Sequence, residues 1–118
     1  MTQHLNTSAG IAQLSQSDSA SLVRASLEKI GAHPATFTHV YAESAIATAM
    51  KADEKRKTGQ QLGALEGLPI SIKDLFDVAG EITMAGSTVR SIASPAVNDA
   101  TVVTRLRHAG AAILGKQI

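Results

Sequence analysis

The fold of this chain is decided by the stretch Leu65-Glu66-Gly67-Leu68-Pro69-Ile70-Ser71-Ile72-Lys73-Asp74-Leu75-Phe76-Asp77-Val78. A linker with two glycines, residues 60–67, leads into it, and the apolar run from Leu68 to Ile72 predicts a strand. Pro69 suits the start of that strand, where a missing backbone donor is tolerated. The strand therefore leads directly to the amine of Lys73 and the carboxylate of Asp74.

Two helices and a short strand are expected before this stretch. The first helix is capped by Asp18 or Ser19 and ends at Gly31; its core-facing residues are Leu22, Val23, Leu27 and Ile30. Residues 36–41 alternate weakly and predict a short strand. The second helix covers residues 42–57 and has small or apolar residues at helical spacing: Ala42, Ala45, Ile46, Ala49 and Met50.

One more helix and one more strand are expected after this stretch. Residues 75–97 hold several turn formers and predict strand and loop. Asn98 or Asp99 can cap the helix, whose inward residues are Val102, Val103, Leu106 and Ala109, and a buried strand follows at Ala111–Leu114. This order predicts a mixed α/β fold that ends in a βαβ unit.

The composition fits one small domain and excludes several classes of protein. Residues 1–17, rich in Ser, Thr and Gln, predict a loose N-terminal arm, and residues 18–118 are expected to form the domain. The chain is 44% hydrophobic with a net charge of +1 and shows no basic face with aromatic readout elements, so we expect no nucleic-acid partner. The absence of cysteine excludes disulfides and thiolate chemistry.

Location follows from the apolar pattern. No apolar run approaches the roughly 20 residues needed to span a membrane, and no basic residue followed by an apolar run marks residues 1–10 as a secretory signal. We therefore expect a cytoplasmic protein without a membrane partner.

Lys73 is the first candidate for chemistry. A lysine that follows an apolar strand must either reach solvent or be held by polar partners. If it is buried, desolvation favours the neutral amine, which can act as a base. If it lies on an edge strand facing water, it is an ordinary surface lysine.

Other polar residues support weaker hypotheses. Ser71 lies two residues before Lys73 and shares its face of the strand, so a self-contained Ser–Lys pair is an alternative. Asp74 and Asp77 have no metal-binding spacing and are expected to bond loop amides or pair with a base. The four histidines are far apart, and no nucleotide-binding loop is present, so no metal or cofactor site is expected.

Three stretches, in this order and spacing, resemble the N-terminal region of the amidase-signature family. They are Leu65–Val78, Thr83-Met84-Ala85-Gly86-Ser87, and Asn98-Asp99-Ala100-Thr101-Val102-Val103 continuing to Leu114-Gly115-Lys116. The resemblance covers roughly residues 20–116 and implies the N-terminal part of that family's mixed sheet flanked by helices. Its first stretch is the most specific.

The resemblance implies hydrolysis of carbon–nitrogen bonds in small-molecule amides by a Ser–cis-Ser–Lys mechanism. Lys73 matches the lysine, whose neutral amine accepts a proton through a bridging serine while a second serine attacks the amide carbonyl. The family's two serines lie in a Gly/Ser-rich loop that has no counterpart here, and Gln117-Ile118 replaces the usual Thr-Asn after the Gly-Lys pair. A truncated gene or a frame change near Lys116 is one hypothesis for this departure.

Two functions therefore remain open. The first is an incomplete amidase that is inactive alone, because triad members act as a unit, and that self-associates through apolar surface meant for the missing sheet. The second is a non-enzymatic binding or interaction module derived from an amidase.

Overall fold

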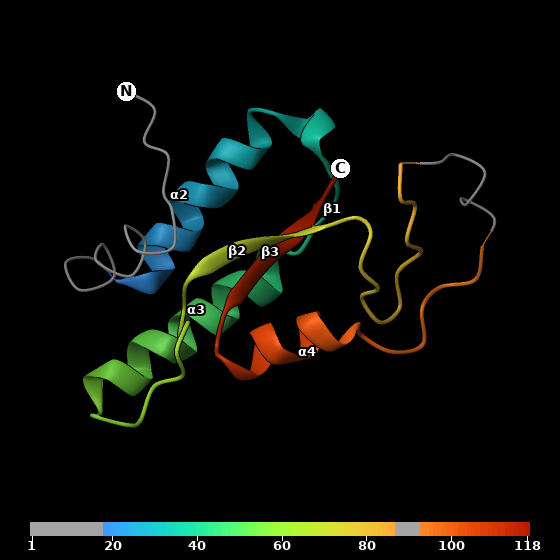
Figure 1. Cartoon of the computed structure of the whole chain (residues 1–118). Coiled ribbons are helices and arrows are strands. Elements are labelled where there is room, and N and C mark those ends of the chain that lie inside the picture. The colour runs from blue at the N-terminus through green and yellow to red at the C-terminus, as the bar shows by residue number, and fades with distance from the viewer. Residues whose placement is uncertain (1–17, 87–92) are drawn as a thin grey trace.

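The computed structural model describes residues 18–86 and 93–118. The predicted arm at 1–17 and Ser87 of the second family stretch lie outside the described residues. Along the chain the elements are α2 (Ser19–Gly31), the 3-10 turn η1 (Pro34–Thr36), β1 (Phe37–Val40), α3 (Ala42–Lys57), β2 (Pro69–Lys73), α4 (Thr101–His108) and β3 (Ala112–Gln117) (Figure 1).

The strands form one sheet in the order β1-β3-β2. β2 pairs in parallel with β3, and β1 pairs antiparallel with the other side of β3. The sequence β2-α4-β3 is thus the expected βαβ unit, and the expected mixed α/β fold is confirmed. β1 and β2 are the two edge strands of this open sheet.

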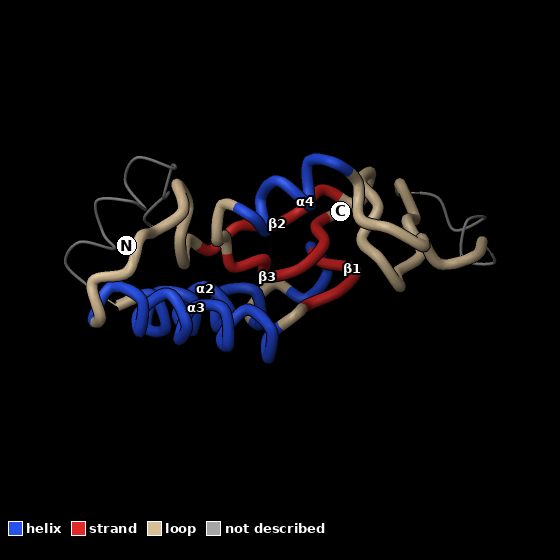
Figure 2. Tube along the Cα trace, turned by 90° about the horizontal axis from the view of Figure 1, so that it is seen from below, coloured by secondary structure: helices blue, strands red, loops and turns tan. Residues whose placement is uncertain are grey.

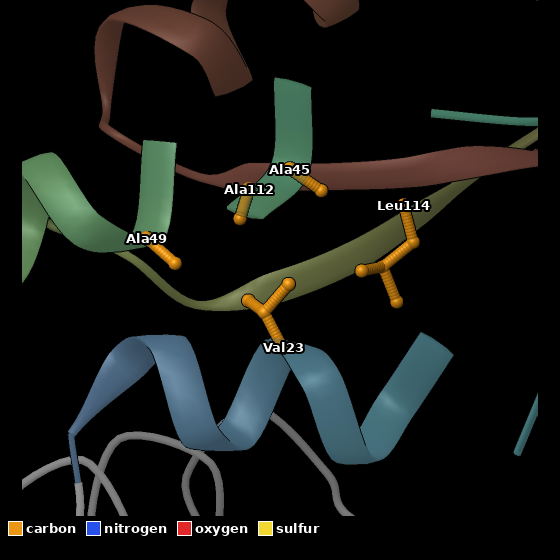
Figure 3. Packing of buried hydrophobic residues seen from close by; sticks show 5 residues of the cluster. All are labelled: Val23, Ala45, Ala49, Ala112 and Leu114. Carbon is orange, nitrogen blue, oxygen red and sulfur yellow. The ribbon is translucent and has the colours of Figure 1, made fainter. Parts of the chain in front are cut away.

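Helices cover both faces of the sheet, as Figure 2 shows: α2 and α3 lie on one face and α4 on the other. Each interface has its own apolar cluster. Val23 of α2 and two alanines of α3 pack against β3 (Figure 3); the full buried cluster is Val23, Ala45, Ala49, Ala112 and Leu114. On the α4 face the buried cluster is Ile72, Val78, Val103 and Ile113.

The helix predictions hold in their spans and fail in three side chains, of which Ala42 is exposed at the start of α3. Asp18 is the N-cap of α2, and its carboxylate accepts a hydrogen bond from the Ser21 amide at 2.7 Å. In α3 the buried face consists of alanines, Ala45, Ala49 and Ala52, which turns Met50 outward with 55% of its surface exposed. Val102 of α4, expected to point inward, is likewise 40% exposed.

The segment between β2 and α4, expected to form strand and loop, is a loop in its described parts. These parts, residues 74–86 and 93–100, contain no strand. Neither Asn98 nor Asp99 caps α4: the N-cap is Ala100, with no side-chain hydrogen bond. The Asp99 carboxylate instead accepts from the Ala79 amide at 2.8 Å and from Arg107 Nε at 3.0 Å, so it fastens the loop to the end of α4. These bonds hold the pKa of Asp99 below its usual range.

Gly115 lets β1 lie close against β3. A Cβ at this position would collide with the carbonyl oxygen of His39 and lie 3.1 Å from the Cα of Val40. Because these neighbours are backbone atoms, we expect Gly115→Ala to lower the free energy of unfolding by about 1–3 kcal/mol. Gly31→Ala, whose added Cβ meets nothing within 4 Å, should change it by less than about 1 kcal/mol. Equal urea midpoints for the two variants would contradict this interpretation.

Glu66 anchors the linker before β2. Its buried carboxylate accepts from Lys55 Nζ at 2.8 Å, and this bond is the main reason that the pKa of Glu66 lies below its usual range. Because the carboxylate is easier to ionise in the folded state, its stabilisation is present above the unfolded pKa and is lost as pH falls through the folded pKa.

Glu66→Gln is therefore expected to lower the free energy of unfolding by about 1–2 kcal/mol at pH 7. The difference from wild type should shrink as pH falls below the unfolded pKa and through the lowered folded pKa, because the wild-type carboxylate then loses its charge as well. Urea unfolding followed at pH 7, 5 and 3 measures this. A difference that stays constant across that range would show that the charge of Glu66 does not stabilise the fold.

Candidate active site

Lys73 is the last residue of β2, and its side chain is exposed. Strand alternation puts it on the face opposite to that of the buried Ile72. Among the described residues, no hydrogen bond or ion pair engages the Lys73 ammonium group. Of the two alternatives that the sequence left open, a buried lysine or an edge-strand lysine facing water, the structure shows the second. The amine of Lys73 is not engaged by any described residue.

Ser71 shares the face of Lys73, as the alternation predicts. Its hydroxyl donates to Gln117 Oε1 at 3.0 Å, across the pairing of β2 with β3. The serine is exposed and held by the neighbouring strand. This geometry gives no support to a self-contained Ser–Lys pair.

Asp74 turns away from Lys73 into the protein, where 3% of its surface remains exposed. Its Oδ1 lies 2.9 Å from Nζ of Lys116, a lysine with no exposed surface at all. Both backbone polar groups of Asp74 are also hydrogen-bonded. Its amide donates to the Gln117 carbonyl, and its carbonyl accepts from the Ala85 amide. Asp74 therefore joins the end of β2 to β3 and to the turn that contains Ala85.

Thr83, which is also buried, extends this pair into a chain of polar groups that ends at the exposed Asp77. Its hydroxyl accepts from Lys116 Nζ at 3.3 Å and donates to Asp77 Oδ1 at 2.6 Å. Asp74 and Asp77 thus bond to a base and to loop groups, as expected from their spacing. In the described ranges, no group of three or more acidic or histidine side chains could hold a metal ion.

A register shift explains why Lys116 faces Asp74. Ile70 pairs with Ile113, but Ile72 pairs with Lys116, so β3 contains one extra residue between the two pairs. Such a bulge reverses the alternation of the following residues. Lys116 thereby shares the face of Ile72 and α4, whereas Gln117 shares the face of Lys73.

A second polar group lies beside this network. His39 of β1 is the register partner of Lys116, and its Nε2 lies 2.7 Å from the carboxylate of Glu81. The ring of Tyr41 stacks against His39 with centroids 6.5 Å apart. Burial, with a smaller contribution from the charge of Glu81, raises the pKa of Tyr41 to about 12, so the phenol stays neutral.

A separate cavity of about 290 Å³ lies between α3, the 60–67 linker and the end of α4. Its lining includes Lys51, Lys55, Glu66 and Arg107. It borders the segments that precede β2 and β3, whereas Lys73 lies at the other end of β2. Lys73 is therefore not part of this cavity. The described helices include none long and apolar enough to cross a membrane.

Known proteins match this chain over most of its length. The family described as Amidase matches residues 21–117. A glutamyl-tRNA(Gln) amidotransferase subunit from Chloroflexus aurantiacus is 41% identical over 118 residues, which cover 96% of this chain and 24% of the relative. The AtzE subunit of 1-carboxybiuret hydrolase from Pseudomonas sp. (strain ADP) is 44% identical over 79 residues, 68% of this chain and 17% of the relative.

Solved structures agree with these sequence matches. A vestigial protein complex linked to the evolutionary origins of an s-triazine catabolic enzyme superposes with a TM-score of 0.85 at 35% identity, covering 96% of this chain and 26% of that one. The native peptide amidase of Stenotrophomonas maltophilia superposes with a TM-score of 0.71 at 32% identity, covering 88% and 22%. The chain thus spans about a quarter of the length of the relatives it matches.

Sequence reasoning singled out Lys73 and missed Lys116. The sole signal for Lys116 is its place after Gly115 at the end of an apolar strand, a position that indicates the family resemblance and not a buried charge. The bulge in β3 that turns Lys116 inward cannot be recognised from the pattern of apolar residues in the sequence.

Proposed function

Because the chain belongs to the amidase-signature family, we propose that it supplies the N-terminal, lysine-bearing part of a hydrolase that cleaves carbon–nitrogen bonds in amides. Lys73 is its catalytic base, and the reaction follows the Ser–cis-Ser–Lys mechanism that the family resemblance implies. The single observation that supports this role best is that Lys73 ends β2 with an exposed amine that none of the described residues engages.

In this mechanism the neutral amine of Lys73 takes a proton from a bridging serine, which in turn deprotonates the attacking serine. Rigid support is useful for such a base, since small displacements of a proton acceptor reduce the rate. The backbone bonds of Asp74 to Gln117 and Ala85 supply that support at the residue next to Lys73.

The 118 residues alone are proposed to be inactive, because the bridging and attacking serines of the family have no counterpart in them. Exposed apolar residues next to the open edge of β2, Leu75 at 59% and Phe76 at 42%, support the proposal that the chain associates with further protein, including other copies of itself. Two relatives carry the word subunit in their names, which favours a larger assembly. We place this assembly in the cytoplasm.

A chimera tests the proposal. Residues 18–118 replace the matching part of the Stenotrophomonas maltophilia peptide amidase, and a fluorophosphonate probe reports an activated serine. The chimera is expected to be labelled and to release ammonia from a peptide amide, whereas the 118-residue chain is expected to do neither. A folded chimera that neither reacts with the probe nor releases ammonia would count against the proposal, and so would labelling of the chain alone that depends on Lys73.

The second candidate is a non-enzymatic interaction module, favoured by the same exposed apolar residues beside β2. Size-exclusion chromatography of the chain separates the two. Association that disappears in Leu75→Ser/Phe76→Ser is expected if these residues pack against further protein in the proposed hydrolase. A stable monomer without activity, in a chain whose chimera is also inactive, would favour the interaction module.

A further inference from the structure

The charges around Lys73 are arranged in a way that the family resemblance does not explain. A base must present a neutral amine, and a free carboxylate within about 4–6 Å of a lysine favours its charged form instead. The sequence places Asp74 directly after Lys73, and Asp77 and Glu81 follow in the same loop. Three carboxylates therefore lie close to Lys73 in sequence.

Each of these carboxylates is engaged by another group. Asp74 pairs with the buried Lys116 at 2.9 Å, Asp77 accepts from the hydroxyl of Thr83 at 2.6 Å, and Glu81 lies 2.7 Å from His39 Nε2. None of them engages Lys73 in the described part of the chain.

Lys116 is central to this arrangement. Lys116 has no exposed surface, and its Nζ contacts Asp74 directly. It also contacts Thr83, the residue that engages Asp77, so it connects two of the three carboxylates. The bulge in β3 turns Lys116 to the face of Ile72, and the alternation of β2 turns Asp74 to the same side. The Asp74 carboxylate, although it is next to Lys73 in the sequence, therefore lies on the face of the sheet opposite to the Lys73 amine.

We propose that Lys116 is a positioning residue for the reaction: it sequesters the Asp74 carboxylate on the α4 face and so leaves the amine of Lys73 without an anionic partner. A buried ion pair often adds little to net stability when it is compared with apolar residues of similar volume. Keeping the Lys73 amine free of an anionic partner gives this ion pair a role beyond stability. The inference rests on the proposed function in taking Lys73 as the base.

The reactivity of Lys73 in the chain itself tests this inference without any serine. The chain is treated with a limiting N-hydroxysuccinimide acetate at pH 8, and the acetylation rate of each lysine is read by peptide mass spectrometry. Lys57, exposed at the end of α3, serves as the internal reference. Lys116→Met leaves the Asp74 carboxylate without its counter-charge and should lower the Lys73-to-Lys57 rate ratio by about three- to tenfold, as expected for one uncompensated unit charge several ångströms away.

Two variants separate charge from structure. Lys116→Arg keeps the cation and should retain the wild-type ratio within about twofold, and Asp74→Asn/Lys116→Met removes both charges and should restore it. An unchanged Lys73-to-Lys57 ratio in a folded Lys116→Met variant would overturn the inference. The inference would also be overturned if Asp74→Asn/Lys116→Met had the same lowered ratio as Lys116→Met alone.

One exposed position keeps the test decisive if Lys116→Met does not fold. Ser71→Asp places a free carboxylate on the Lys73 face, two residues away on the same strand. It should lower the Lys73 ratio by about threefold or more, while Ser71→Asn should not. Equal ratios for these two variants would overturn the inference, because a free carboxylate would then not affect Lys73. Acetylation does not need an active enzyme. An inactive chimera together with the expected acetylation ratios would therefore contradict the proposed function and leave the effect of Lys116 on Lys73 supported.

Discussion

Lys73→Ala is expected to lower kcat/KM for amide hydrolysis in the chimera by about 10³-fold or more. The reason is that the variant loses the acceptor for the serine proton, and triad members act as a unit. Folding should be unaffected, because the Lys73 side chain is exposed and has no partner among the described residues. Ammonia release from a peptide amide, measured at several pH values, gives the rate.

Lys57→Ala is the matched control for this prediction. Lys57 is also exposed and lies at the end of α3, away from Lys73 in the chain. We expect its variant to keep the wild-type rate within about twofold, since exposed substitutions away from structural features change stability by about 0.5 kcal/mol or less. A Lys73→Ala chimera that hydrolyses the amide as fast as this control would exclude Lys73 as the base.

Lys116→Met is expected to lower the free energy of unfolding by about 3–5 kcal/mol, because it leaves the Asp74 carboxylate buried and unpaired. This is a large part of the total for a small domain, which is about 5–15 kcal/mol. Urea unfolding followed by circular dichroism measures the loss. Lysine and methionine have similar lengths, so the variant removes the charge and leaves little empty space.

The double variant Asp74→Asn/Lys116→Met shows whether the loss comes from the unpaired charge. Replacing both members of a buried pair by neutral groups is far less costly than removing one. We expect the double variant to recover at least half of the stability that the single variant loses. If the two variants are equally unstable, packing of the Lys116 side chain, and not its charge, supports the fold.

Much of the fold follows from the sequence, because its signals are local. Gly31 and Gly59 mark helix ends, and the alanine spacing of α3 predicts its span to the residue. Met50 and Val102 are expected in the core because they are apolar and lie close to the inward stripe, yet tertiary packing selects the small alanines of α3 and Val103 of α4. Whether a single side chain at the margin of an apolar stripe is buried depends on its neighbours in space.

The candidate site is less accessible to sequence reasoning. Lys73 stands out because it ends an apolar strand, and the resemblance implies its role. The pairing of Asp74 with Lys116 joins residues 42 positions apart in the chain, and it depends on the extra residue in β3, which no local pattern reveals. The cap of α4 fails for a similar reason, since Asp99 bonds to Ala79 and Arg107 instead of the helix amides.

The role proposed for Lys73 is best tested by the position of its amine in a complete enzyme. A crystal structure of the chimera gives the distance from Lys73 Nζ to the nearest serine hydroxyl. We predict a hydrogen bond of about 2.6–3.2 Å to a serine of the Gly/Ser-rich loop, with Asp74 still paired to Lys116. A chimera with amidase activity in which the Lys73 amine remains in solvent, away from any serine, would exclude this role.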